Sequence, residues 1–170
     1  GSGVQEIGGE AFYPCDSLTS LSIPDSVRWI GYTAFAWCTG LTELNLGNGI
    51  EEMDEAVFRG CSALTSVTLP DAMETIGREM FAHCSGLKEV VFGSELKEIG
   101  YNAFYGCDQL QYNTYDNAYY LGSGENPYFA LMKKLNQDIE TLQIHPDTVI
   151  IAGNAVSDCY NLTSITIPDS

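Results

Sequence analysis

Apolar side chains recur along this chain with a period of 23 residues. An aromatic residue follows five positions after the start of each period, a cysteine after eight and a leucine after eleven. The starts are Ile7, Ile30, Met53, Ile76 and Ile99, and the aromatic positions are Phe12, Phe35, Phe58, Phe81 and Phe104. Because one such unit cannot bury its own apolar side, the period predicts a stack of similar coils that share a continuous core.

The pattern inside one unit predicts the shape of a coil. Residues 18–23 alternate apolar and polar side chains, as a strand with one buried face does. Pro24-Asp25-Ser26 is typical of a turn, and residues 27–30 are expected to extend again. Residues 33–38 are expected to form a single helical or 3₁₀ turn. Strands of successive coils would then form a parallel sheet.

The period fails once. Polar Asn113 and the ring of Tyr115 replace two apolar strand positions, and the pattern returns only at Ile151. This predicts regular repeats over residues 4–111, an irregular aromatic-rich insertion over 112–138, and further repeats over 139–170. Residues 1–3 resemble the remnant of an expression tag. Neither end resembles a polar cap, so we expect a fragment of a longer array, with open ends that can associate end to end with other copies.

Composition narrows the classes of partner. The chain has 7 Lys and Arg against 23 Asp and Glu, a formal net charge of −16. Phosphate binding needs clustered basic residues, so nucleic acid and anionic membrane surfaces are disfavoured as partners, whereas a basic partner fits. No apolar run approaches the roughly 18 residues of a membrane span, and no signal peptide is present in this sequence.

The unit at residues 64–84, which contains Leu-Pro-Asp, Ile-Gly, Met-Phe and Cys at fixed spacing, resembles the BspA-like, or Treponema-type, leucine-rich repeats. The resemblance covers about residues 4–170. It implies an α/β-type solenoid: a right-handed coil of about seven repeats with its parallel sheet on the concave face. It also implies a bacterial cell-surface or secreted protein that serves in adhesion or protein binding.

The cysteines all occupy one position of the repeat. Neighbouring coils would hold their sulfurs near 5 Å, too far for a disulfide of about 2.05 Å without strain. This favours a ladder of buried free thiols over disulfides, and over a metal site because no Cys-x-x-Cys occurs. The ladder comprises Cys15, Cys38, Cys61, Cys84, Cys107 and Cys159.

No constellation in the sequence indicates catalysis, a metal or a cofactor. His83 precedes Cys84, but adjacent residues in a turn point apart, so a surface histidine is the better interpretation. Acidic pairs such as Glu51 and Glu52 are interpreted as solvated. Each Asp-containing turn supplies one carboxylate, whereas Ca²⁺ needs six to eight oxygens. We therefore expect a non-catalytic protein.

Two surfaces are candidates for partner binding. The first is the outward strand face, with Glu43, Asn45 and Glu89, and with His145 expected to be exposed on the same face. The second is the insertion, whose aromatics either form a platform for protein or glycan or pack over the solenoid. They are Tyr112, Tyr115, Tyr119, Tyr120, Tyr128 and Phe129. The hypothesis is a module that binds a host or microbial protein; the alternative is a spacer without a ligand of its own.

Overall fold

The structure, a computed structural model, describes residues 3–169 in two compact units. The first unit ends at Leu110 and the second begins at Gln111. Gly1 and Ser2 of the expected tag, and Ser170, lie outside the described residues. No helix in the described range is long and apolar enough to span a bilayer.

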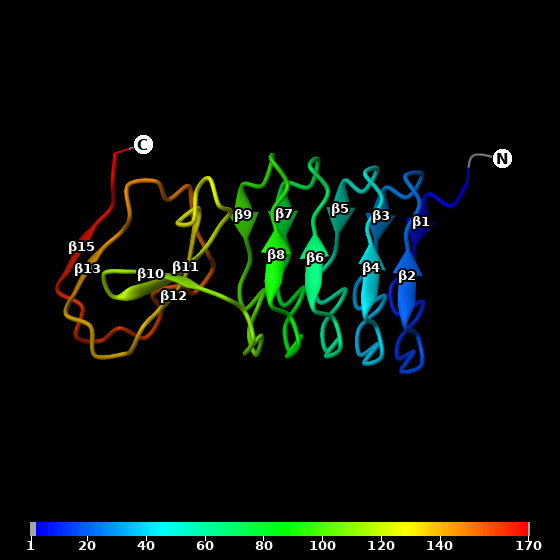
Figure 1. The fold of residues 1–170 in the computed structure, drawn as a ribbon, viewed down its shortest axis with the longest axis horizontal. Helices are drawn as coiled ribbons and strands as arrows, with labels where there is room; N and C mark the ends of the chain where they lie inside the picture. Colours follow the sequence, from blue (N-terminus) through cyan, green and yellow to red (C-terminus); the bar gives the residue numbers. More distant parts are fainter. Residues whose placement is uncertain (1–2, 170) are drawn as a thin grey trace. The chain divides into compact units, whose positions relative to one another are not determined.

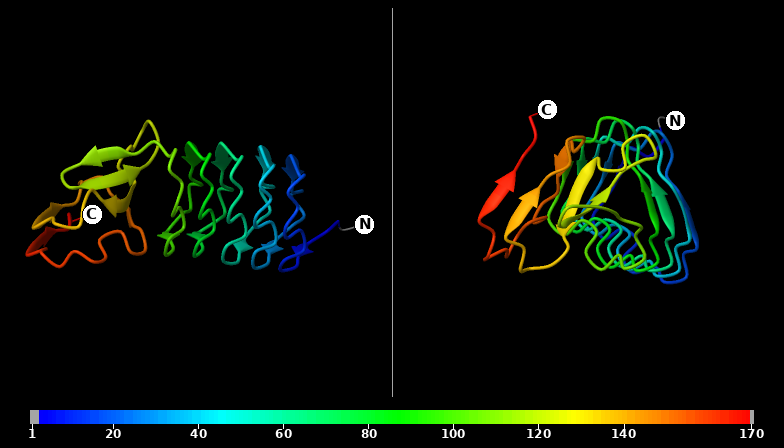
Figure 2. Two further views of the ribbon diagram at one scale, coloured as in Figure 1. Left: turned by 90° about the horizontal axis from the view of Figure 1, so that it is seen from below. Right: turned by 60° about the vertical axis from the view of Figure 1, so that its left-hand side comes forward.

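The first unit is a stack of coils in which short and long strands alternate along the chain. The short strands are β1 (Glu6–Ile7), β3 (Trp29–Ile30), β5 (Glu52–Met53), β7 (Thr75–Ile76) and β9 (Glu98–Ile99). The long strands are β2 (Ser20–Ser22), β4 (Glu43–Asn45), β6 (Ser66–Thr68) and β8 (Glu89–Val91). Each long strand turns its central residue inward and its flanking residues to solvent, as the alternating pattern predicts. Figure 1 and Figure 2 show these coils side by side.

Strand pairing follows the 23-residue period without slippage. Ile7 of β1 lies opposite Ile30 of β3, and Leu21 of β2 lies opposite Leu44 of β4, both in parallel ladders. Ile76 of β7 and Ile99 of β9 continue the same register. The predicted repeat solenoid with parallel strands is thereby confirmed.

Parallel pairing is interrupted once within the first unit. The long strands form two separate pairs, β2-β4 and β6-β8, and the short strands divide into β1-β3-β5 and β7-β9. In the described residues, β4 and β5 therefore have no ladder to β6 and β7. We call this place the interrupted junction; Figure 1 shows β6 farther from β4 than from β8.

The expected helical or 3₁₀ turn at residues 33–38 is wrong: no helix forms there. Thr33 and Trp37 adopt φ of 50° and 59°, in the left-handed region that interrupts a helix. N–H groups alternate in direction along the segment. That of Ala36 donates within the coil, to the carbonyl of Thr33, and that of Phe35 donates to Val57 of the next coil, both at 3.0 Å. We call these segments the Phe turns; the one after β5 bonds to the one after β7, across the interrupted junction.

A column of phenylalanine rings fills the core of the first unit. Phe35, Phe58 and Phe81 are fully buried, and consecutive rings stack nearly parallel with centroids 5.6–5.7 Å apart. Phe12 begins the column, 5.0 Å from Phe35, and is 45% exposed. The column explains why the period keeps an aromatic residue at this position.

The second unit combines an antiparallel sheet with returning repeats. Its sheet contains β10 (Asn113–Tyr115), β11 (Ala118–Leu121), β12 (Ala130–Lys134) and β14 (Ile150–Ile151). Strand β12 pairs antiparallel with β11 and parallel with β14, so it joins the hairpin to the repeat pattern. Strands β13 (Thr141–Gln143) and β15 (Ser164–Thr166) form a parallel pair in the 23-residue register.

Candidate functional site

The aromatic insertion folds as a β-hairpin. Tyr115 and Ala118 are the last pair before a two-residue loop, in which Asp116 adopts φ of 48°. Asp tolerates this left-handed conformation, as tight hairpin loops require. The Asp116 carboxylate also accepts the N–H of Gln143 at 2.6 Å, which ties the loop to β13. The hairpin is thus a fixed scaffold for the tyrosines on its two faces.

Tyr112 and Tyr119 lie together on one side of the hairpin. Their half-buried rings are 5.6 Å apart and tilted by 57°. The exposed Lys133 of β12 places its ammonium 4.3 Å from the Tyr112 centroid and 5.4 Å from that of Tyr119. A cation near aromatic faces at these distances is attracted by their negative electrostatic potential. We call these three residues the tyrosine–lysine clamp.

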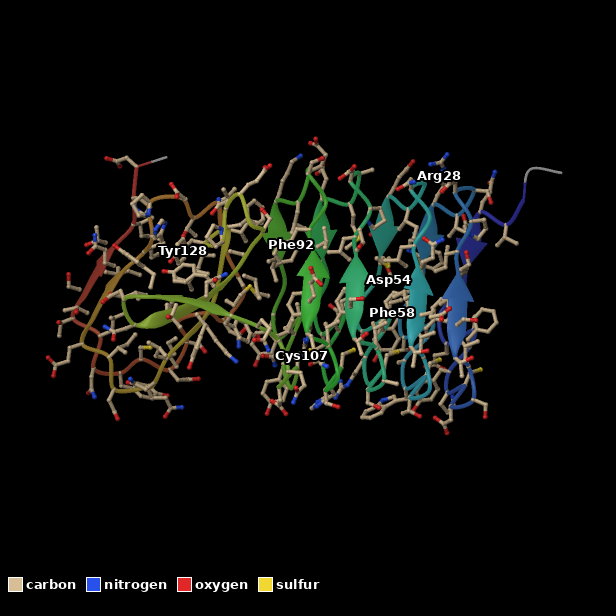
Figure 3. The ribbon with its side chains drawn as sticks, in the orientation of Figure 1. Arg28, Asp54, Phe58, Phe92, Cys107 and Tyr128 are labelled. Atoms are coloured by element: carbon tan, nitrogen blue, oxygen red, sulfur yellow. The ribbon has the colours of Figure 1, made fainter. Side chains whose placement is uncertain are left out.

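The other side of the hairpin carries a packed aromatic cluster. Tyr120 is fully buried, and its ring meets Tyr128 edge-on at 5.6 Å. Tyr128 stacks on His145 at 3.9 Å, and Tyr115 meets His145 edge-on at 4.7 Å. The Tyr128 ring therefore lies between the hairpin and the segment after β13 (Figure 3). This side serves as a small core.

Two of the candidate residues are therefore packed. His145 departs from the sequence expectation, whereas for Tyr120 the sequence left both packing and an exposed platform open. His145 was expected on an exposed strand face, but its side chain is only 18% exposed because two rings cover it. Tyr120 has no surface to offer a partner, and its hydroxyl accepts the N–H of His145 at 3.4 Å. Burial raises the pKa of Tyr120 above its ordinary value, because the phenolate would be poorly solvated.

The remaining aromatic candidate, Phe129, is half-buried beside this core. Its carbonyl accepts the N–H groups of Val149 and Ile150, which fixes the backbone between the hairpin loop and β12. Among the insertion's aromatics, Tyr112 and Tyr119 are the ones that lie beside an exposed cation, that of Lys133.

The strand-face candidates lie in the first unit. Glu43 and Asn45 of β4 and Glu89 of β8 are exposed. Asn45 reaches Ser22 at 3.5 Å, so part of its hydrogen-bonding capacity is used within the face. Because β4 and β8 belong to different sheets, the structure does not unite these three residues in one ladder.

A family model described as "BspA type Leucine rich repeat region" matches residues 2–123 and 131–170, in six copies. The chain belongs to this family. The BspA-type repeats thus cover both units, including β10 and β11 of the hairpin. No curated protein matches the chain in sequence.

Solved structures show the same fold. A T. pallidum leucine-rich repeat protein is 28% identical with a TM-score of 0.64, over 98% of this chain and 64% of that one. A leucine-rich cell surface protein from Faecalibacterium prausnitzii is 23% identical with a TM-score of 0.61, over 97% of this chain and 59% of that one. The pneumococcal vaccine antigen PcpA is 19% identical with a TM-score of 0.54, over 98% of this chain and 57% of that one. The chain thus spans less than two thirds of each of these proteins.

The cysteines of the BspA-type repeats are free thiols within the described residues, Cys15 and Cys159 half-buried and the other four buried. Each buried thiol donates to the carbonyl of the phenylalanine 26 residues earlier, for example Cys84 to Phe58 at 3.1 Å. Burial raises the pKa of Cys61 to about 12 and that of Cys84 well above its ordinary value. Because only the thiolate is a good nucleophile or metal ligand, these positions are chemically quiet at neutral pH.

The histidine considered for catalysis is engaged in packing. His83 stacks against Trp37 at 6.3 Å and meets Tyr105 edge-on at 5.4 Å. In the part of the chain that the structure describes, no three His, Cys, Asp or Glu side chains gather as a metal site would require.

Sequence reasoning missed a groove in the first unit. It has a volume of about 570 Å³ and is lined by residues before and after the interrupted junction, with Tyr32 near one end and Tyr101 near the other. The signal available was the set of acidic residues in and after the short strands, Glu52, Glu55 and Glu98.

Proposed function

We propose that this chain is a non-catalytic protein-binding module of a bacterial cell-surface or secreted protein, with a host or microbial protein as its partner. Support for the surface assignment comes from the similar proteins, one described as a cell surface protein and one as a vaccine antigen. Support for binding comes from the tyrosine–lysine clamp. Tyrosine rings of this kind supply large contact area at low entropic cost and are enriched among interface hot spots.

The clamp is the observation that carries the proposal. Its rings are half-buried, so the hairpin holds them in place while part of each surface stays accessible. Lys133 adds a positive charge in a chain whose formal net charge is −16. A partner with an apolar patch beside a carboxylate would complement this combination.

The test compares two variants of the chain against a panel of purified host surface proteins and a glycan array. Tyr112→Ala/Tyr119→Ala removes the rings of the clamp, whereas Tyr160→Ala removes a tyrosine that is 89% exposed in the same unit. We expect saturable binding to a protein of the panel, weakened about tenfold or more by the double substitution, as hot-spot truncation costs. Tyr160→Ala is expected to bind like the wild type.

A spacer without a ligand is the second candidate. The small polar strand face, exemplified by Ser66 and Thr68, supports it, as does the self-contained packing around Tyr120. Absence of saturable binding to any panel member, or equal binding by the clamp variant and the wild type, would favour the spacer. Binding to glycans alone would replace the protein partner with a carbohydrate.

A further inference from the structure

The interrupted junction coincides with a change in the charge pattern. Position 28 of the first unit and its equivalents 23 residues apart are Arg28, Glu51, Glu74 and Lys97. Arg28 lies 3.6 Å from Glu51, and Lys97 lies 2.7 Å from Glu74. These opposite-charge pairs span the ladders β3-β5 and β7-β9. Between them, Glu51 and Glu74 are like-charged neighbours, which disfavours pairing of adjacent strands.

The turns between the long and short strands show the same contrast. Asp25 accepts the N–H of Asn48 at 2.8 Å, and Asp71 accepts that of Ser94 at 3.1 Å. Each of these bonds joins turns whose flanking strands pair. The turn before the interrupted junction has Asn48 at this position, so the charged acceptor is missing there. A neutral acceptor gives a weaker hydrogen bond than a carboxylate.

The groove of about 570 Å³ is lined by residues of β5, β7 and β9 and of the segments that follow β3, β5, β7 and β9. Its exposed lining includes the carboxylates of Glu52, Glu55 and Glu98, whereas Met53 and Ile76 turn their side chains into the core. Asp54 also lines it but is already engaged, because it accepts the indole N–H of Trp29 and the backbone N–H of Tyr32, each at 3.2 Å. Figure 3 labels Asp54 and Arg28 in this unit.

Arg78 is a basic residue of the groove lining, and its position shows how the groove can hold a cation. Arg78 lies with its guanidinium 5.5 Å from the Tyr101 ring centroid, and its Nε is 3.7 Å from Glu79. Tyr32 lines the same groove and is 52% exposed. A second cation beside Tyr32 would find an aromatic ring and the carboxylates of Glu52 and Glu55, the combination that Arg78 uses at Tyr101.

We propose that this groove binds an extended segment of a partner protein that carries Arg or Lys, whose cation is placed beside the Tyr32 ring and the carboxylates of Glu52 and Glu55. The proposal rests on the proposed role in protein binding but uses a different surface from the tyrosine–lysine clamp.

The probe is the blocked peptide acetyl-Gly-Arg-Gly-Arg-Gly-amide, with a peptide carrying Gln in place of Arg as its control. Binding is measured by calorimetry, and its location by NMR shifts of the backbone amides of Glu52, Thr75 and Glu98, which line the groove. Glu52→Gln/Glu55→Gln neutralises two groove carboxylates. Glu6→Gln/Glu95→Gln makes the same change in charge at exposed positions outside the groove, and Glu6 is the repeat equivalent of Glu52.

We expect the Arg peptide to bind the wild type, to bind the groove variant about tenfold more weakly, and to bind the control variant within twofold. Equal weakening in the two variants would overturn the proposal, because it would reflect only the negative field of the chain. Equal binding of the Gln peptide, or no amide shift at Glu52, Thr75 and Glu98, would also overturn it. Neither result bears on the clamp, since no clamp residue is altered.

Discussion

The Phe column provides a test in which the repeat supplies its own control. Phe58→Ala removes a fully buried ring that stacks on Phe35 at 5.6 Å and on Phe81 at 5.7 Å. Truncating a buried phenylalanine typically costs about 3–5 kcal/mol, and each stacked pair adds roughly 0.5–1.5 kcal/mol beyond the buried area. We expect Phe58→Ala to lower the free energy of unfolding by about 4–5 kcal/mol, near the upper end of the first range.

Phe12→Ala makes the same chemical change at the equivalent position of the first coil. Phe12 is 45% exposed and stacks on one ring, Phe35, at 5.0 Å. With about half of the burial and one stacked pair, the expected loss is roughly 2 kcal/mol. The two variants should therefore differ by about 2–3 kcal/mol although the substitution is identical.

Urea unfolding followed by tryptophan fluorescence measures both losses. Both tryptophans, Trp29 and Trp37, lie in the first unit, so the signal reports on the unit that contains the column. Repeat stacks can unfold in steps, so coincidence of the fluorescence and circular dichroism transitions checks that one free energy applies. Equal losses for the two variants, or a loss below about 2 kcal/mol for Phe58→Ala, would refute the column as the core's main support.

Two further predictions follow from single positions. The pKa of Cys61 is raised from 9.0 to about 12, so its contribution to stability is complete below about pH 9 and is lost as pH rises toward 12. Urea titrations at pH 9 and 10 should show that the free energy of unfolding falls by up to about 1.4 kcal/mol because of this thiol. The fall should be absent in Cys61→Ala and should remain in the control variant Val57→Ala. Gly60 has φ of 75°, and a Cβ there would lie 2.5 Å from the Trp37 ring. Gly60→Ala should therefore lower the free energy of unfolding by about 2 kcal/mol and the thermal midpoint by several degrees. Gly8→Ala, which has open space around its Cβ, should change the midpoint little. A similar shift in both variants would contradict this prediction.

Register was the part of the fold most firmly predicted by the sequence. The 23-residue period places Ile7 opposite Ile30 and Ile76 opposite Ile99, and the structure has these pairs. The prediction succeeds because a one-residue slip would turn the apolar face of a strand to solvent. At residues 113–115 the sequence predicted only that the pattern fails, and in the structure these residues form the hairpin strand β10.

The Phe turns were predicted less well for a physical reason. Residues such as Ala34 and Phe35 suit a helical turn locally, and the apolar pattern does not distinguish helix from turn over so few positions. The left-handed φ of Thr33 and Trp37 comes from hydrogen bonds to the next coil, which tertiary stacking supplies. Local propensity contains no information about those bonds.

The candidate site was also predicted only in part. The insertion was recognised because the period fails there, but composition alone could not assign its rings to the two sides of the hairpin. Tyr119 and Tyr120 are adjacent in β11 and so point to opposite sides, one to the clamp and the other to the buried cluster. The pairing partners of β11, which the sequence did not predict, decide which side is covered.

The interrupted junction shows how a repeat protein can vary its surface without altering its core. The buried positions on both sides, Met53 and Ile76 among them, keep the apolar character of the period. The change lies in exposed residues, where Glu51 is followed 23 residues later by like-charged Glu74 instead of a cation. Because the Phe turns stay bonded across the junction, the strands can separate there without dividing the stack. Charges read at intervals of 23 residues, rather than along a strand, therefore identify where such a stack departs from uniform pairing.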